Sequence, residues 1–264
     1  SQQPNGAANS FDHSLRYLLR QCESKRVRRS YMSSQRSITA EMSAILVDWM
    51  VDVSQKFKLL PQTLFMAVGL LDRFMSLRQV EQSKLQLAGI TCVMIIGKYE
   101  EIFPPTVKDY IEVCDGIYTP RELLEAEGEV LLTLNFDLNL AVPFVMLEFF
   151  RHFICLDERE FALCHFFLES SLLDLEHLDF SAAELAGGAI LLAKASFQKE
   201  VWGKKEESIT KISLSAAKEA AKFLFAVGKK LEALDLNAVK DKFSSPKYFG
   251  ISGLSVEQRI FRLG

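Results

Sequence analysis

Residues 85–97 read LQLAGITCVMIIG, a run in which only Gln86 and Thr91 carry polar side chains. A helix with apolar side chains on nearly every face is enclosed by other helices, because any face left open would expose apolar surface to water. The run is well short of the roughly 20 residues that a membrane-spanning helix needs. Gly89 costs about 1 kcal/mol relative to alanine inside a helix, and close approach of a second helix is the usual reason to accept that cost. The stretch therefore predicts an enclosed helix within a helical domain.

The same pattern returns about 100 residues later in the chain. Leu70-Leu71-Asp72 is followed by Leu87-Ala88-Gly89, and in the same order Leu172-Leu173-Asp174 is followed by Leu185-Ala186-Gly187. The second glycine-containing run is again apolar nearly all round as far as Ala195. The matching order and spacing predict a tandem pair of helical domains.

Helix starts are marked along the chain, whereas strands are not. Pro61 and Pro120 suit the first turn of a helix, Ser181 is followed three residues later by Glu184 in a capping-box pattern, and Ser10 marks an N-terminal helix. Clusters of Val, Ile and Thr with period-two alternation are absent over useful lengths. These features predict an all-α chain.

Composition and charge exclude several function classes. The net charge is −3 and the sequence pI is about 5.9, so no strong positive field attracts nucleic acid or an anionic membrane. Residues 1–10 are polar and lack the apolar core of a signal peptide. The five cysteines include no C-x-x-C pair, which favours reduced thiols in a reducing compartment. The missing initiator Met suggests a fragment of a longer protein.

No catalytic or metal-binding constellation is apparent. Gly187-Gly188 falls inside a predicted helix and not between a strand and a helix, so it does not form a phosphate-binding loop. None of the histidines has zinc-site spacing: His13, His152, His165 and His177. We expect His165, in the apolar run 161–168, to be a core residue, and we expect no metal and no cofactor.

The segment 42–53 carries two apolar stripes on one predicted helix. The first stripe contains Met42, Ile45, Leu46, Trp49 and Val53, and the second contains Ala44, Val47 and Val51. A helix needs one stripe to join a core, so the other is either enclosed as well or offered to a partner. Periodicity leaves both alternatives open.

Six segments, taken in order, resemble the A- and B-type (mitotic) cyclins. MSAILVDW at 42–49 is similar to the "MRAIL…W" helix of the cyclin box, and SPKY at 245–248 resembles the C-terminal "SKY" segment. Between them lie LLDRF at 70–74, KLQLAG at 84–89, KYEEIFPP at 98–105 and LNFDL at 134–138. A single such segment means little, but the order and spacing of all six are specific. The resemblance covers roughly residues 10–252 and is strongest over 42–138.

The resemblance implies a fold and a function. The fold is a tandem pair of five-helix cyclin boxes, with an N-terminal segment and helix over 1–34, boxes over 35–138 and 139–235, and a C-terminal tail over 236–264. The function is that of a non-enzymatic subunit that activates a cyclin-dependent Ser/Thr kinase in mitotic control, in the nucleus and cytoplasm.

In cyclins, the residues that match Lys98 and Glu127 hydrogen-bond the backbone at the start of the kinase's PSTAIRE-type C-helix. Residues that match Phe136, Leu138 and Leu15 pack against that helix. Glu100 and Glu101 belong to the same expected surface, since carboxylates near a helix C-terminus oppose the helix dipole and are easier to understand beside a partner. The alternative for Lys98 and Glu127 is a purely structural ion pair.

The resemblance also implies a site for Arg-x-Leu peptides of substrates and inhibitors. It comprises six residues: Met42, Ile45, Leu46, Trp49, Asp52 and Gln86. A leucine seated among such apolar side chains gains roughly 1.5–3 kcal/mol, and Asp52 can pair with the peptide's arginine.

Two positions depart from the family pattern. Ser43 stands where cyclins usually have an arginine that pairs with the aspartate matching Asp72, so we expect Asp72 to find Arg73, Lys98 or water instead. Asp52 replaces the usual glutamate, which shortens its reach.

Other interpretations remain for parts of the chain. The basic run 25–29 fits a phosphate-binding or nuclear-import segment, or a solvated linker. A second candidate for the whole chain is another cyclin-fold protein, such as a transcription-factor core that binds DNA and polymerase, which the acidic pI argues against. A third candidate is an unrecognised enzyme.

Overall fold

The computed structural model describes residues 13–20, 26–197, 199 and 202–254; these residues contain helices and loops and no strand. The α-helices of the N-terminal half are α2 (Ala40–Phe57), α3 (Pro61–Leu77), α4 (Leu85–Glu100), α5 (Val107–Val113) and α6 (Pro120–Thr133). Those of the C-terminal half are α7 (Pro143–Ile154), α8 (Glu158–Ser171), α9 (Ala182–Ser196), α10 (Lys204–Thr210), α11 (Leu214–Ala233) and α12 (Ala238–Ser244). Short 3-10 helices include η1 (Arg29–Ser34), η2 (Gln82–Lys84), η3 (Leu175–Asp179), η4 (Pro246–Tyr248) and η5 (Ile251–Gly253).

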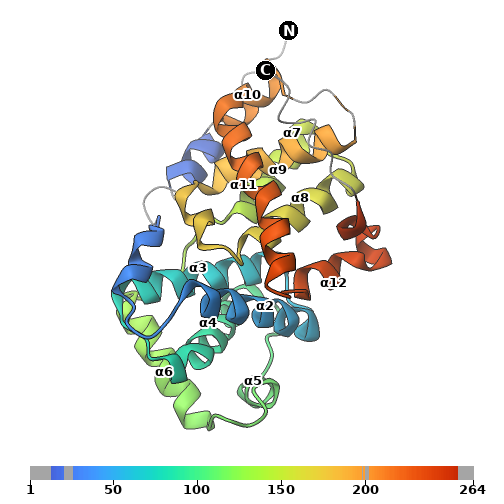
Figure 1. The fold of residues 1–264 in the computed structure, drawn as a ribbon. Helices are drawn as coiled ribbons and strands as arrows, with labels where there is room; N and C mark the ends of the chain where they lie inside the picture. The colour runs from blue at the N-terminus through green and yellow to red at the C-terminus, as the bar shows by residue number, and fades with distance from the viewer. Residues whose placement is uncertain (1–12, 21–25, 198, 200–201, 255–264) are drawn as a thin grey trace.

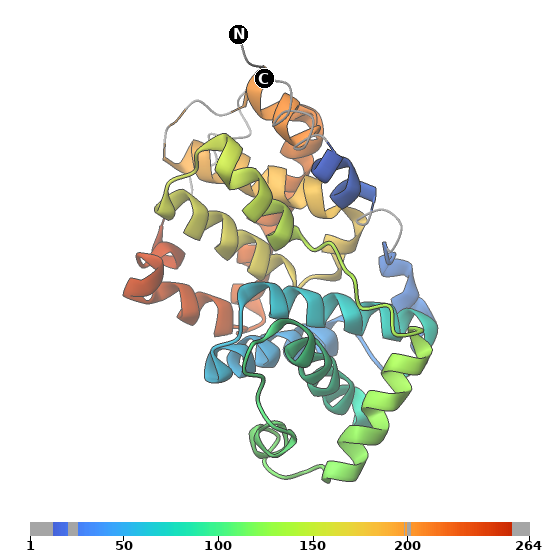
Figure 2. The same ribbon diagram turned by 180° about the vertical axis from the view of Figure 1, so that it is seen from behind.

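The helices form two stacked groups (Figure 1). Helices α2–α6, which we call the N-box, make up the lower half, and α7–α11, the C-box, make up the upper half; the view from behind shows the same two layers (Figure 2). Residues 13–20 are also helical and lie beside the C-box in both views. The predicted all-α tandem pair of five-helix domains is confirmed for the described chain.

Each box is built around one enclosed helix. In α4 every residue from Leu87 to Gly97 is buried, and the helix packs against α2, α3, α5 and α6. In α9 the buried run extends from Leu185 to Ala193, and the helix packs against α7, α8 and α11. Both buried helices carry the repeated Leu-Ala-Gly motif near their start. The prediction of two enclosed helices is therefore confirmed.

Capping residues set the helix starts that the sequence indicates. Thr119 and Glu122 form a capping box at α6, as do Ser181 and Glu184 at α9. Pro61 is the first residue of α3. The start predicted at Ser10 lies outside the described residues.

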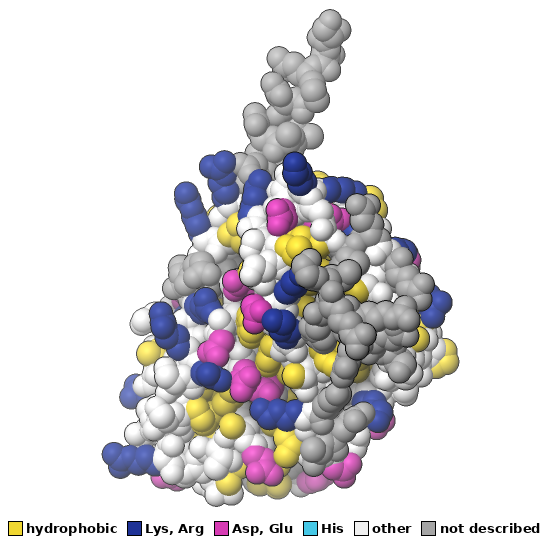
Figure 3. Space-filling view, turned by 45° about the horizontal axis from the view of Figure 1, so that its top comes forward, with side chains coloured by type: hydrophobic (Ala, Val, Ile, Leu, Met, Phe, Trp, Pro, Cys, Tyr) yellow, Lys and Arg dark blue, Asp and Glu magenta, His cyan; other side chains and the backbone are white. Residues whose placement is uncertain are grey.

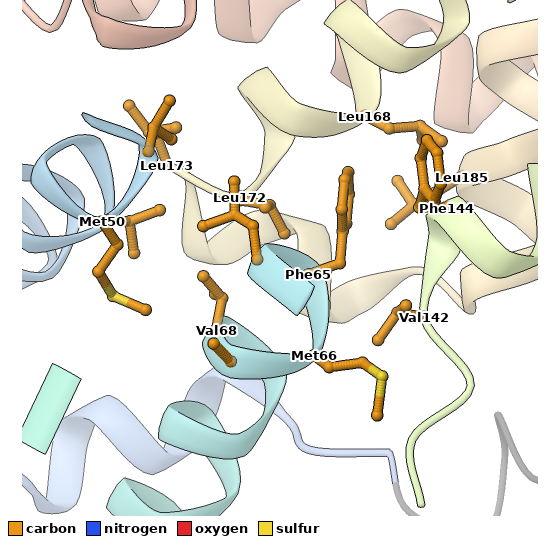
Figure 4. Packing of buried hydrophobic residues seen from close by; sticks show 14 of the residues in the cluster. Met50, Phe65, Met66, Val68, Val142, Phe144, Leu168, Leu172, Leu173 and Leu185 are labelled. Carbon is orange, nitrogen blue, oxygen red and sulfur yellow. The ribbon is translucent and has the colours of Figure 1, made fainter. Parts of the chain in front are cut away.

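The two boxes share a continuous core. Phe65 and Val68 on α3 point toward the following box, where Phe144, Leu172, Leu173 and Leu185 lie (Figure 4). The rings of Phe65 and Phe144 stack with their centroids 5.6 Å apart. Burial of this surface fixes the boxes relative to each other, since apolar area removed from water stabilises by about 25 cal/mol per Å².

Helix α12 fastens the C-terminal part of the chain across both boxes. It packs against α2 of the N-box and α8 of the C-box. The Lys242 Nζ donates to both carboxylate oxygens of the fully buried Glu169 at 2.6 Å, and the backbone N–H of Ala238 donates to Asp48 at 3.1 Å. Burial alone would raise the pKa of Glu169, but Lys242 and His165 hold it below its usual value.

His165 is a core residue, as predicted. It is 2% exposed, and its Nε2 lies 2.9 Å from Glu169. Its ring packs against the rings of Phe144 and Phe243. Burial lowers the pKa of His165, which favours the neutral ring.

Gly188 tests the contact between α9 and α11. A Cβ at this position would lie 2.7 Å from the Ala220 Cβ and 2.8 Å from the Ala221 backbone nitrogen, so we expect Gly188→Ala to destabilise the chain by about 1–3 kcal/mol in urea denaturation. Gly228 on α11 has no neighbour within 4 Å of an added Cβ, so Gly228→Ala should stabilise by up to about 1 kcal/mol. Equal stability of Gly188→Ala and the parent chain would contradict this packing.

Candidate functional site

The last turn of α4 brings a charged pair to the surface. Lys98 Nζ lies 2.6 Å from Glu127 Oε1 on α6, and the two side chains are 42% and 17% exposed. Both are accessible from outside the chain, although the helix that carries Lys98 is buried up to Gly97. The ammonium has further N–H donors and the carboxylate a second oxygen, so the pair keeps hydrogen-bonding capacity for another molecule.

Exposed apolar side chains follow Lys98 in the sequence. Tyr99, Ile102 and Phe103 are 55%, 86% and 92% exposed, whereas the apolar residues of the core are buried. All three lie within the KYEEIFPP segment, but none of them was among the predicted site residues. The sequence contains a signal for their exposure. Two large apolar residues directly before Pro104-Pro105 lie beyond the end of the helix, so they cannot be buried on its core-facing side.

Phe136 is presented on a tight turn after α6. Asn135 and Phe136 both adopt left-handed backbone angles, with φ of 51° and 57°, which non-glycine residues rarely do. The Phe136 N–H donates to the Leu131 carbonyl at 2.8 Å, and Arg73 Nη1 donates to the Asp137 carbonyl at 2.7 Å. The Phe136 ring is 63% exposed as a result. We call Lys98, Glu127, Phe103 and Phe136 the platform.

Two expected members of this surface do not fit it as predicted. Leu15 is fully buried in the core of this chain, so it is not open to a partner helix in this structure. Glu101 turns back onto α3, where its Oε1 accepts hydrogen bonds from the Leu60 N–H at 2.7 Å and the Thr63 hydroxyl at 2.6 Å. Its carboxylate therefore faces the favourable N-terminal end of α3, which removes the electrostatic cost that had suggested a partner. Glu100 and Leu138 are only half-buried, so both stay accessible.

The residues of the expected peptide site lie on α2 and at the start of α4, and we call this set of six residues the groove. Its residues differ in exposure: Ile45 is 54% exposed, Asp52 is exposed, Met42, Trp49 and Gln86 are half-buried, and Leu46 is 6% exposed. Leu46 lies beneath these side chains and contacts Gly89. It therefore supports the surface from below and exposes little area of its own to a peptide. The Tyr118 hydroxyl lies 3.2 Å from the Gln86 Oε1 and orients that side chain.

The two stripes of α2 have different surroundings. Ala44, Val47 and Val51 are all buried, whereas the first stripe is buried at Leu46 and Val53 and open at Ile45. The alternative in which both stripes are enclosed is therefore wrong at Ile45.

Acidic residues gather at one end of the groove. Burial raises the pKa of Asp52, and the charge of Asp241 on α12 raises it further. Burial also raises the pKa of Asp48, with smaller contributions from Asp52 and Asp241. Mutual repulsion of these carboxylates favours an incoming cation, since a positive charge between them stabilises their ionised forms.

Asp72, which lacks an arginine partner because position 43 is a serine, has partners other than the predicted ones. Its Oδ1 accepts a hydrogen bond from the Tyr31 hydroxyl at 2.7 Å, and its Oδ2 lies 3.7 Å from Nε2 of His177 in the C-box. The predicted partners Arg73 and Lys98 are engaged elsewhere, with Asp137 and Glu127. Burial raises the pKa of Asp72, and His177 and the Tyr31 hydrogen bond oppose that rise. The expectation of Arg73 or Lys98 was wrong because it considered neighbours in the N-box alone.

The described part of the basic run is not simply solvated. The guanidinium of Arg26 donates to the carbonyls of Leu178 and Asp179, and Arg29 pairs with Asp179 at 3.0 Å. These bonds attach the N-terminal linker to η3.

On the face shown in Figure 3, Lys and Arg side chains alternate with Asp, Glu and hydrophobic ones and form no continuous basic patch.

No group of three or more His, Cys, Asp or Glu side chains among the described residues is arranged to hold a metal ion. None of the described helices combines the length and apolarity needed to cross a bilayer.

Family comparisons agree with the fold and the motif order. The model for the N-terminal domain of cyclins matches residues 13–139, and the model for the C-terminal domain of cyclins matches residues 144–257. The chain therefore belongs to the cyclin family.

Its relatives include both B-type and A-type cyclins. It is 34% identical over 220 residues to cyclin-B2-2 of Oryza sativa subsp. indica, covering 83% of this chain and 52% of that protein. It is 31% identical to putative cyclin-A3-1 of Arabidopsis thaliana, covering 86% and 66%, and 32% identical to G2/mitotic-specific cyclin-B2 of Homo sapiens, covering 89% and 59%. The chain thus spans about half to two thirds of the length of these relatives.

Solved structures share the fold at low sequence identity. A viral cyclin from herpesvirus saimiri superposes with a TM-score of 0.72 at 20% identity, covering 81% of this chain and 95% of that one. A chain of the yeast RNA Pol II CTD kinase CTDK-1 complex gives a TM-score of 0.65 at 13% identity, covering 92% and 80%.

Tyr31→Phe tests the junction at Asp72. Losing the hydroxyl should cost about 1–3 kcal/mol, because the buried carboxylate loses its hydrogen bond. The folded-state pKa of Asp72 is raised, so the stability it contributes when protonated is lost as pH rises through that pKa. The Tyr31 hydrogen bond opposes this rise, so it stabilises the ionised carboxylate more than the protonated one. Urea denaturation at two pH values on either side of the folded-state pKa of Asp72 should therefore show the larger loss at the higher pH. Tyr99→Phe, at an exposed ring, should change stability by less than about 0.5 kcal/mol. An equal loss at both pH values would contradict a charged Asp72 at this junction.

Proposed function

We propose that the chain is a regulatory subunit that binds a cyclin-dependent Ser/Thr protein kinase through the platform and activates it. The observation that carries the proposal is the Lys98–Glu127 pair, in which Lys98 reaches the surface at the end of an otherwise buried helix and meets a partly exposed Glu127 on α6. An ammonium and a carboxylate 2.6 Å apart offer a donor and an acceptor to the backbone groups left free at the start of a partner's helix. Phe103 follows Lys98 in the sequence and Phe136 follows Glu127, and both have exposed rings that suit an apolar helix face.

Activation would occur by population shift. The free kinase keeps its C-helix rotated outward, so its catalytic Lys–Glu pair and its Mg²⁺-holding aspartate are misaligned. Binding that favours the inward helix selects the active state, and the chain supplies no catalytic group of its own. The proposal is supported by the fold neighbour found within a yeast kinase complex and by relatives named as G2/mitotic-specific cyclins. Mitotic control, and action in the nucleus and cytoplasm, belong to the same proposal.

The groove would recruit substrates and inhibitors that carry an Arg-x-Leu motif. The apolar patch around Ile45 and Trp49 accepts the leucine, and Asp52, with Asp48 and Asp241 nearby, attracts the arginine. Burial of one leucine gives roughly 1.5–3 kcal/mol, which suits weak and reversible recruitment.

The double variant Lys98→Ala with Glu127→Ala tests the platform. We expect at least a tenfold loss of affinity for the purified kinase and loss of histone phosphorylation, since both polar anchors are gone. The control Glu219→Ala with Lys222→Ala removes an exposed pair of similar length, 2.7 Å, on α11 and should leave activation unchanged. Undiminished activation by the first variant, or failure of the parent chain to bind or activate the kinase, would refute the proposal.

Trp49→Ala tests the groove separately. Phosphorylation of a substrate with an Arg-x-Leu motif should fall several-fold through a raised KM, because the leucine loses its apolar contact. Phosphorylation of a matched peptide without the motif should be unchanged, as should both substrates with Leu77→Ala, which removes an exposed apolar side chain outside the groove. An equal fall with both substrates would show that Trp49 supports activation itself and would contradict recruitment.

A further inference from the structure

The chain contains two hydroxyl residues followed directly by proline, in the pairs Thr119-Pro120 and Ser245-Pro246. Proline-directed Ser/Thr kinases select pairs of this kind, but the two hydroxyls are not equivalent. Thr119 Oγ1 donates to the Glu122 carboxylate at 2.8 Å and accepts from the Glu122 N–H at 3.3 Å, in the capping box of α6. The Ser245 hydroxyl makes no hydrogen bond to a described residue, so it is free to react.

Ser245 lies on a surface turn between two short helices. Helix α12 ends at Ser244, and η4 begins at Pro246. The backbone of Ser245 is extended, with φ of −69° and ψ of 153°, as is usual before proline. Ser245 is half-buried, whereas Ser244, Pro246 and Lys247 are exposed, and the segment after α12 lies at the edge of the molecule in both ribbon views (Figures 1 and 2). A kinase can therefore approach this turn from solvent.

Two lysines share an open pocket with Ser245. The pocket offers about 260 Å³ to the centres of water-sized groups, whereas a single water needs about 10–15 Å³. Its walls include Lys58, the residue that caps the C-terminal end of α2, and Lys247. Both lysines are exposed, and neither forms an ion pair with a described residue. The pocket thus has room for a phosphate beside two available ammonium groups.

Two other charged residues line the pocket. Lys242 is committed to the buried Glu169, to which it donates two hydrogen bonds of 2.6 Å. Asp241 on α12 is exposed and opposes an incoming anion. The charges left to act on a group at Ser245 are therefore two lysines and one aspartate, which favours an anion.

We propose that Ser245 is a phosphorylation site and that Lys58 and Lys247 hold its phosphate. The kinase transfers the γ-phosphoryl group of ATP to the Ser245 oxygen. A P–O bond to serine forms, the bond between the γ-phosphorus and ADP breaks, and the hydroxyl proton passes to the kinase's catalytic base. The product carries about −1.5 to −2 charges at pH 7 and accepts charge-assisted hydrogen bonds from the ammonium groups. Because Lys58 belongs to the N-box, the phosphate ties the turn after α12 to that box.

Phosphate mapping on the full chain tests the site. The chain is incubated with ATP and a proline-directed Ser/Thr kinase that is active on its own, so the result does not depend on the platform. We expect mass spectrometry to place the phosphate on Ser245 and not on Thr119, whose hydroxyl is held in its capping box, and Ser245→Ala should abolish the incorporation. No phosphate on Ser245, or equally fast modification of Thr119, would overturn the proposal.

The melting temperature of the phosphorylated chain tests the two lysines. Phosphorylation should raise it by about 1–3 °C, because the new contacts form only in the folded state. The rise should vanish in Lys58→Asn with Lys247→Gln; asparagine suits position 58, where φ is 54°. The control Lys222→Gln, at an exposed lysine on α11, should keep it. No rise in the parent chain, or an equal rise in the double variant, would overturn the role of the lysines.

Discussion

The structure depends on a simple constraint: a helix that is apolar on every face cannot expose any of those faces to water, so other helices must surround it. Helix α4 obeys this constraint from Leu87 to Gly97, and α2, α3, α5 and α6 provide the enclosure. Close approach requires small residues; a Cβ at Gly97 would lie 2.6 Å from the Tyr110 hydroxyl. The last turn emerges from this enclosure, and Lys98 is among the side chains that it brings to the surface.

The same helix separates the two candidate binding surfaces. Gln86 borders the groove at the start of α4, and Lys98 anchors the platform at its end, so a rise of 1.5 Å per residue places them about 18 Å apart along the axis. A packed helix is a rigid spacer, because it cannot bend without opening gaps in the core. Kinase activation and substrate recruitment, as proposed, would thus occupy fixed and separate positions on one subunit.

Local patterns in the sequence predicted most of the fold. The apolar run of α4, its repeat in α9 and the helix-start signals at Pro61, Pro120 and Ser181 required only neighbours in sequence. Residues whose partners lie far along the chain could not be placed in this way. Asp72 meets His177 of the other box, and Asp48 meets the N–H of Ala238. Leu15 and Glu101 failed for the same reason, since their roles depend on which surface the chain itself covers.

Hydrogen–deuterium exchange of the chain, alone and with an excess of a cyclin-dependent kinase, tests the central claim most directly. The account predicts that backbone amides in residues 98–103 and 124–138 become protected in the complex, while those in residues 42–52 exchange at an unchanged rate. Protection confined to residues 42–52 or to the C-box, or no protection anywhere, would show that the end of α4 is not the docking surface.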